Sequence, residues 1–229
     1  MVDRYLPQSR VEEIGKTGQL KLREASVLIV GCGALGSPLA MYLAGSGLGH
    51  ITLADFDTVD ITNLHRQVFF TETETGLKKA ALLRDKMLRL NSSISVEVVE
   101  KVVSRRLLNS MGRIYDVIID AADNPSTTFA LSEFCASAKR PFVTAGVSGW
   151  EAQIFTFIPG SFAYHEVFPR PSDEGGVLPC SIAGIVGPVA GFAASLQAIS
   201  VIKIITGVAC ASSSLLSANM LTGEFNSLS

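Results

Sequence analysis

The sequence is poor in charged residues, cysteine and tryptophan. Only 17% of its 229 residues are charged and 48% are hydrophobic, which excludes an intrinsically disordered chain. The four cysteines show no CxxC spacing and no apolar run opens the chain, so we expect a cytoplasmic protein without a disulfide framework. Nineteen Lys and Arg face 21 Asp and Glu, which leaves no basic excess to attract nucleic acid.

Charge is also scarce in one part of the chain. Residues 141–229 hold seven of the 40 charged side chains, and residues 182–202 hold none. That run is long enough for a membrane span, but glycine, proline and polar residues interrupt it, and Lys203 alone flanks it. Because a helix buried in a core or a subunit interface has the same composition, we predict no membrane span.

Apolar segments alternate with helical patterns through the first 146 residues. Strands are expected over 27–30, 51–54, 94–99, 117–119 and 142–144, and helices over 36–46, 76–91, 105–111 and 126–139. This alternation is typical of a parallel sheet with helices on both faces. After residue 146, the pattern predicts an exposed or antiparallel strand at 153–158, a long loop at 159–179, the uncharged helix and a hairpin at 214–228.

We therefore predict an α/β fold with a Rossmann-like, mostly parallel sheet flanked by helices and extended by antiparallel strands in the C-terminal part. Residues 1–229 form a single domain, in which residues 1–146 are the nucleotide-binding half and residues 147–229 are the extension.

A glycine-rich loop, from Gly31 to Gly36 with the sequence GCGALG, joins the first strand to the first helix. In such a loop Gly31 permits a tight turn, Gly33 lets the backbone approach a phosphate, and Gly36 lets helix and strand pack. Asp55 ends the second strand, where a carboxylate accepts hydrogen bonds from ribose hydroxyls. These features fit NAD, FAD or ATP, and a structural glycine turn followed by a solvated acid is the alternative.

The next loop favours ATP among these cofactors. A carboxylate that attacks a polyphosphate must overcome like-charge repulsion, which Arg66 and Lys79 are placed to neutralise. Asp123, just past the fourth strand, is a candidate ligand for Mg²⁺ on the phosphates. Taken singly, Arg66 also fits a surface ion pair, Lys79 a solvated helix residue and Asp123 a helix N-cap.

Six motifs in this order resemble the ubiquitin-activating-like adenylyltransferases of the ThiF/MoeB/HesA family, over nearly the whole chain. They are Gly31-x-Gly33-x-x-Gly36, Asp55-Phe56-Asp57-x-Val59, Asn63-Leu64-x-Arg66-Gln67, Gly76-x-x-Lys79, Asp123-Asn124 and Cys180-x-x-Ala183-Gly184. The resemblance implies a homodimer that uses Mg-ATP to adenylate the C-terminal Gly-Gly carboxylate of a small ubiquitin-like sulfur carrier. Pyrophosphate is released, and the carrier serves sulfur transfer in thiamin, molybdopterin or related biosynthesis.

The resemblance also implies roles for particular residues. Residues that correspond to Asp55, Asn63, Arg66, Lys79 and Asp123 contact ATP or its metal in the family, and Ala34 lies against the nucleotide. We extend the cofactor-binding set to the other motif residues: Gly31, Gly33, Gly36, Asp57, Gln67 and Asn124. Residues 147–229 then supply the crossover loop and the surface for the dimer and the carrier.

Cys180 resembles a family cysteine that links covalently to the carrier in some members and is dispensable in others. A thiolate near a helix N-terminus has a lowered pKa and is a better nucleophile, but a half-buried structural thiol fits this position equally well. The other cysteines, Cys32, Cys135 and Cys210, are predicted to be small buried hydrophobic residues.

The chain departs from the family pattern at three places. Pro7 and Thr128 stand where many relatives have arginine, and the two CxxC pairs that hold zinc are absent, so we predict no zinc. These departures leave open a degenerate member that binds nucleotide or a ubiquitin-like partner without turnover. A NAD-dependent oxidoreductase is a further, less favoured alternative, because it rests on the glycine loop alone.

Overall fold

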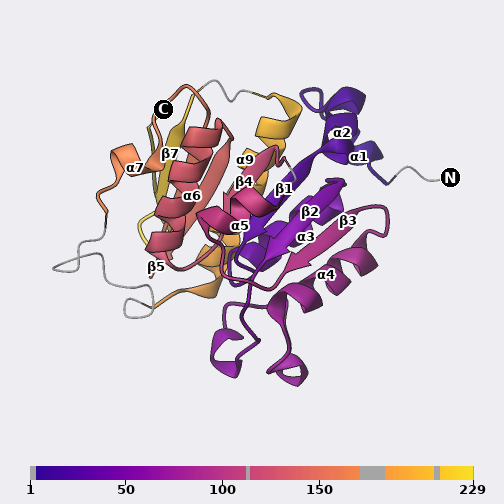
Figure 1. Ribbon diagram of the computed structural model, residues 1–229, viewed down its shortest axis with the longest axis vertical. Helices are drawn as coiled ribbons and strands as arrows, with labels where there is room; N and C mark the ends of the chain where they lie inside the picture. The colour runs from indigo at the N-terminus through magenta and orange to yellow at the C-terminus, as the bar shows by residue number, and fades with distance from the viewer. Residues whose placement is uncertain (1–3, 112–113, 171–183, 209–211, 229) are drawn as a thin grey trace.

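The computed structural model describes residues 4–111, 114–170, 184–208 and 212–228. Eight strands within these residues form one sheet in the order β3-β2-β1-β4-β5-β6-β7-β8 (Figure 1). The strands are β1 (Ser26–Val30), β2 (His50–Ala54), β3 (Ser95–Val99), β4 (Val117–Asp120), β5 (Phe142–Ser148), β6 (Glu151–Phe157), β7 (Ser214–Asn219) and β8 (Glu224–Leu228). The helices are α1 (Leu6–Ser9), α2 (Gly15–Glu24), α3 (Gly36–Ser46), α4 (Lys79–Leu90), α5 (Arg105–Ser110), α6 (Pro125–Ala138), α7 (Tyr164–Val167) and α9 (Gly187–Thr206), with 3-10 turns η1 (Ile61–Asn63) and η2 (Glu72–Glu74).

The sheet has a parallel part and an antiparallel part, which confirms the predicted fold class. Strands β3, β2, β1, β4 and β5 are parallel, with Ile29 of β1 paired to Leu53 of β2 and to Ile119 of β4. Strands β6, β7 and β8 then add to β5 in antiparallel fashion. Strand β5 is continuous to Ser148, so the proposed division between residues 146 and 147 falls inside a strand.

Helices cover both faces of the parallel strands. Val27 and Ile29 face the core that α3, α4 and α9 form, while Leu28 and Val30 face a second core with α5 and α6. Figure 1 shows α5 and α6 in front of the sheet and α3 and α9 behind it. Because both sides of β1 are buried, its sequence reads as continuously apolar.

Some boundaries differ from the sequence expectation for local reasons. Helix α4 begins at Lys79 and not near Gly76, because Gly76 has a φ of +85° and Lys78 is extended. Helix α6 begins at Pro125, where Asn124 accepts a hydrogen bond from the Ser126 amide. The short helix α7 lies within the segment expected to be a loop.

Helix α9, of 20 residues, contains most of the uncharged run and is long and apolar enough to cross a membrane. It packs against α2, α3, β4, β5 and β6. Its buried residues include Ala193, Ala194, Gln197 and Val201. Packing on the sheet thus accounts for the buried face of the helix, which is 44% of an apolar 18-residue window within it.

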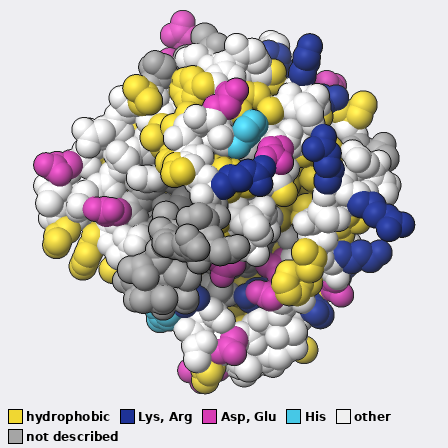
Figure 2. Space-filling view, turned by 60° about the vertical axis from the view of Figure 1, so that its left-hand side comes forward, with side chains coloured by type: hydrophobic (Ala, Val, Ile, Leu, Met, Phe, Trp, Pro, Cys, Tyr) yellow, Lys and Arg dark blue, Asp and Glu magenta, His cyan; other side chains and the backbone are white. Residues whose placement is uncertain are grey.

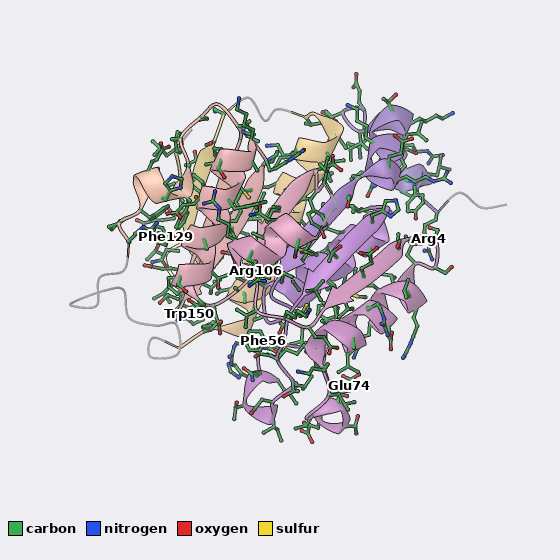
Figure 3. The ribbon with its side chains drawn as sticks, in the orientation of Figure 1. Arg4, Phe56, Glu74, Arg106, Phe129 and Trp150 are labelled. Atoms are coloured by element: carbon green, nitrogen blue, oxygen red, sulfur yellow. The ribbon has the colours of Figure 1, made fainter. Side chains whose placement is uncertain are left out.

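The strand order brings three loops to one place. From β1 the chain adds β2 and β3 on one side of the sheet, and β4 and β5 on the other side. In folds with such a switch in strand order, ligands bind outside the carboxyl ends of the strands at the switch, which here lies between β1 and β4. The loops after β1, β2 and β4 all lie at this edge. In Figure 3, Phe56 marks this edge, after β2, and Arg4 lies near the opposite end of the strands.

Candidate nucleotide site

The glycine-rich loop follows β1, and its geometry requires two of its glycines. Gly31 has a φ of +95°, and a Cβ there would lie 2.6 Å from the carbonyl oxygen of Ala121. A Cβ on Gly36 would lie 1.9 Å from the carbonyl oxygen of Gly31. The loop therefore closes tightly on itself and on the turn after β4, as its sequence predicts.

Gly33 and Ala34 form the outer part of the same loop. A Cβ on Gly33 would lie 3.3 Å from Nε2 of Gln67, so this glycine lies against the next loop. Gln67 is buried and its Oε1 has no hydrogen-bond partner among the described residues. Ala34 is partly buried and packs on the core.

Asp55 joins the glycine loop to the end of β2. Its Oδ2 accepts a hydrogen bond of 2.7 Å from the amide of Cys32, and its Oδ1 accepts one of 2.7 Å from the amide of Asp57. Each carboxylate oxygen retains a further lone pair. Asp55 thus fixes the loop and is still able to accept hydrogen bonds from ribose hydroxyls.

Lys79 is the first residue of α4, and its side chain is 7% exposed. Its Nζ lies 3.3 Å from Oδ2 of Asp57, and its charge also acts on Asp60 and on Cys32. A lysine is seldom buried without a partner for its charge. The position therefore keeps a cation near the glycine loop, where an anion would be stabilised.

Arg66 and Asn63 belong to the loop between β2 and α4. Nη2 of Arg66 donates a hydrogen bond of 2.6 Å to Oδ1 of Asn63. A Cβ on Gly187, the first residue of α9, would lie 2.8 Å from the carbonyl oxygen of His65 and 3.3 Å from Cα of Arg66. Close packing of the start of α9 thus fixes the backbone that carries Arg66.

Asp123 and Asn124 lie on the turn that follows β4. Asp123 is exposed, and Asn124 is the N-cap of α6, with Oδ1 accepting from the amide and hydroxyl of Ser126. The N-cap that the sequence offered as an alternative role for Asp123 therefore belongs to Asn124. Asp123 remains available for a ligand.

Asp120 and Thr144, which are buried beneath this turn, were not among the candidate site residues of the sequence analysis. Asp120 is 1% exposed, and its carboxylate accepts hydrogen bonds from the amide of Ala122 and the hydroxyl of Thr144. Burial raises the pKa of Asp120 to about 6. An acid that ends an apolar strand was the available signal, but Thr144 is far away in sequence and only the sheet brings it close.

Two of the four cysteines lie among the described residues and two lie outside them. Cys32 and Cys135 are buried free thiols, and burial raises the pKa of both, so neither is activated as a nucleophile. Cys180 and Cys210 lie outside the described residues, and the predicted role of Cys180 stays a prediction.

The residues present fit a nucleotide with its metal. The glycines let the loop pack closely against the turn after β4 and the start of α3, as in phosphate-binding loops, and Lys79 and Arg66 supply positive charge on the neighbouring segments. No group of three or more His, Cys, Asp or Glu in the described part of the chain forms a metal site by itself. Mg²⁺ is usually held by one or two carboxylates with phosphates and waters, and Asp123 is an exposed carboxylate on the turn after β4.

Comparisons with known proteins agree with this geometry. The ThiF family pattern matches residues 5–229. The adenylyltransferase and sulfurtransferase MOCS3 of Dictyostelium discoideum is 38% identical over 90% of this chain and 48% of its own length, and that of Culex quinquefasciatus is 40% identical over 90% and 47%. The chain spans about half the length of the curated relatives that it matches.

Solved structures show the same fold. The structure of E. coli MccB with ATP superposes with a TM-score of 0.84 at 26% identity, over 99% of this chain and 71% of that one. The E. coli MccB structure with MccA-N7isoASN gives a TM-score of 0.85 at 26% identity, over 100% and 72%. The family match covers nearly the whole chain, and the chain belongs to the ThiF family.

Proposed function

We propose that the chain adenylates the C-terminal Gly-Gly carboxylate of a small ubiquitin-like sulfur carrier in the cytoplasm. The observation that carries this proposal is that Asp55 binds the glycine loop through the Cys32 amide and that the buried Lys79 acts on the same loop, with Arg66 on the loop that follows β2. The names of the MOCS3 relatives, adenylyltransferase and sulfurtransferase, and the ATP complex of MccB support it.

The reaction transfers AMP to a carboxylate. An oxygen of the carrier's carboxylate attacks the α-phosphorus of ATP, a bond forms between them, and the bond from that phosphorus to the leaving pyrophosphate breaks. The negative charges of attacking group and phosphates repel, and charge accumulates on the leaving group. Fixed cations stabilise such a transition state because they are oriented before the reaction begins.

Each residue of the site has a defined task in this proposal. Asp55 holds the glycine loop and accepts the ribose hydroxyls, and Lys79 and Arg66 neutralise the phosphates. Asp123 would hold Mg²⁺, which supplies further neutralisation of the phosphates when it is bound. Gln67, Asn63 and Asn124 shape the surrounding loops.

We further propose that the enzyme works as a homodimer. Arg4 lies near the end of the strands opposite the glycine loop (Figure 3), and α1, which contains Pro7 and is capped by Arg10, lies at the same end (Figure 1). In place of the arginine that Pro7 replaces, we propose that Arg10 reaches the nucleotide site of a partner subunit, because it lies far from the site of its own chain. An apolar cavity of about 660 Å³, lined by residues that include Met41, Tyr42, Ile199 and Ile202, opens between α3 and α9 and offers a surface for such a dimer.

Exchange between ATP and labelled pyrophosphate, measured with a carrier that ends in Gly-Gly, tests the proposal. We expect exchange that requires both the carrier and Mg²⁺. The substitution Asp123→Asn should abolish this exchange. A carrier shortened by its last glycine is the matched control. Nucleotide binding by calorimetry without exchange, with every Gly-Gly carrier of the same organism, would instead establish a binding module without turnover.

Cys180 is proposed to act after adenylation. Cys180→Ser is then expected to retain pyrophosphate exchange and to lose any covalent adduct with the carrier, as seen by mass spectrometry. Loss of exchange in this variant would contradict the separation of the two steps.

A further inference from the structure

Thr128 stands where the family pattern has an arginine, and its position in the fold shows what it contacts. It lies in α6, one turn after the N-cap, and is 8% exposed. Its hydroxyl hydrogen-bonds to the carboxylate of Asp120. Thr128 therefore acts inward, beneath the site, and does not present its hydroxyl to a bound nucleotide.

Asp120 joins four elements of the fold through this contact and three others. Its Oδ1 accepts a hydrogen bond of 3.1 Å from the Ala122 amide, and its Oδ2 accepts one of 2.9 Å from the hydroxyl of Thr144 in β5. Its carbonyl oxygen accepts one of 2.8 Å from Nε2 of Gln197 in α9. The end of β4 is thus tied to β5, α6 and α9 at a single residue.

These contacts determine the position of the turn at the site. The turn, residues 121–124, contains the Ala122 amide that Asp120 accepts from, and it carries Asp123 and the N-cap of α6. Its first residue, Ala121, packs so closely on Gly31 that a Cβ on Gly31 would lie 2.6 Å from the Ala121 carbonyl oxygen. A shift of the turn would therefore move Asp123 and the glycine loop together.

Burial raises the pKa of Asp120, and among the described residues the charge that acts on it is that of Asp123 on the turn, an anion that raises this pKa further. Burial, and then the charge of Asp120, raise the pKa of Cys135 in α6 and of Tyr164 in α7. Hydrogen bonds from neutral donors therefore stabilise the buried carboxylate, and each is worth more to an ion than to a neutral group.

We propose that Asp120 is a positioning residue of the nucleotide site and that Thr128 is its hydroxyl partner, so that neutral hydrogen bonds hold the turn that carries Asp123. The effect of this arrangement on catalysis rests on the proposed function. It also changes the meaning of the departure at residue 128, because a threonine that binds Asp120 does not by itself indicate a degenerate site.

The test compares Thr128→Val, which removes the hydroxyl at nearly constant volume, with Thr128→Ser, which keeps it. We expect the valine variant to lose about tenfold in Mg-dependent affinity for ATP, as for one hydrogen bond to a charged group. Affinity for ATP without Mg²⁺ should fall less, because only the glycine loop and not Asp123 then contributes, and the serine variant should resemble the parent protein. Equal Mg-dependent affinity in the valine and serine variants would overturn the inference.

A second measurement does not depend on nucleotide. Hydrogen exchange of the Ala122 amide, followed by NMR, should be faster in Thr128→Val than in Thr128→Ser, because the turn opens more often when the Asp120 carboxylate loses one of the hydrogen bonds that hold it. Unchanged exchange would overturn the inference, whether or not the protein adenylates a carrier. If Thr128→Val does not fold, Thr144→Val with Thr144→Ser as control probes the same carboxylate from β5.

Failure of the proposed function gives a different result from failure of this inference. A protein that never exchanges pyrophosphate, but whose Ala122 amide responds to Thr128→Val, would refute adenylation and keep the positioning role. A protein that exchanges pyrophosphate normally with valine at residue 128 would keep adenylation and refute the positioning role.

Discussion

The parallel and antiparallel parts of the sheet contribute different kinds of side chain to the candidate site. The parallel part and its loops carry the charged side chains, among them Arg66, Lys79 and Asp123. The antiparallel part and α9 carry few charges, and Figure 2 shows most Lys and Arg side chains on the right-hand side of that view. Yet Thr144 in β5, at the junction of the two parts, and Gln197 in α9 both bind Asp120 beneath the site. The charged part supplies the proposed chemistry, and neutral side chains at the junction and in the charge-poor part keep it in position.

The largest effect expected in the antiparallel part is on stability. Phe155 of β6 is 2% exposed and contacts the rings of Phe162, Tyr164 and Phe168. We expect Phe155→Ala to lower the free energy of unfolding by about 3–5 kcal/mol, measured by chemical denaturation. The control Phe225→Ala, at an exposed ring of β8, should cost about 1 kcal/mol. Similar losses in both variants would show that β6 does not carry a core.

The largest effect expected in the parallel part is on rate. Lys79→Met should lower the kcat/KM of pyrophosphate exchange by about 10²–10³-fold, because it removes a fixed cation from the phosphates. Lys78→Met is the matched control, since Lys78 is exposed and donates to the Phe56 carbonyl oxygen. An equal loss in both variants would mean that total charge, and not the buried position, matters.

The junction between the two parts should show in the dependence of stability on pH. The folded pKa of Asp120, about 6, exceeds the ordinary value of 3.8, so the native state binds more protons in this window. Its contribution to stability therefore falls as pH rises from about 4 to 6, by up to about 3 kcal/mol. Asp120→Asn should remove this fall, and denaturation at several pH values measures the difference from the parent protein.

Asp60 provides a control of opposite sign. Hydrogen bonds from the side chain and the amide of Thr62 lower its pKa, so its contribution is present at neutral pH and is lost as pH falls through the lowered folded pKa. Asp60→Asn should therefore differ most from the parent protein at neutral pH. If Asp120→Asn follows the same trend, the buried carboxylate is not held as described.

The smallest expected effect is at Gly191, and Gly36 provides the contrast. A Cβ on Gly191, within α9, meets no atom within 4 Å, so Gly191→Ala should stabilise the protein by about 0.5–1 kcal/mol. Gly36→Ala, in the glycine loop, should prevent nucleotide binding because its Cβ would overlap the Gly31 carbonyl oxygen. Denaturation and calorimetry distinguish the two. Loss of stability in Gly191→Ala would indicate that another surface covers this face of α9.

Much of the fold and of the candidate site followed from local patterns. The apolar strands, the turn glycines and the acid at the end of β2 act over short distances, and the structure places Asp55, Asp57 and Lys79 together as expected. The start of α4 was predicted too early, because Gly76 takes a left-handed conformation and Lys78 remains extended. Asn124, and not Asp123, became the cap of α6, a choice between neighbours that sequence spacing does not resolve.

The sequence by itself determined the α/β class and the glycine loop, and it proposed the charged residues of the candidate site, because hydrophobic period, glycine and charge are local properties of the chain. Only the tertiary structure decided which neutral side chains support that site. Thr144 and Gln197 reach Asp120 from elements 24 and 77 residues away in sequence, and no local pattern marks them. Burial then decided the pKa of Asp120, since desolvation depends on what the completed fold packs around a carboxylate.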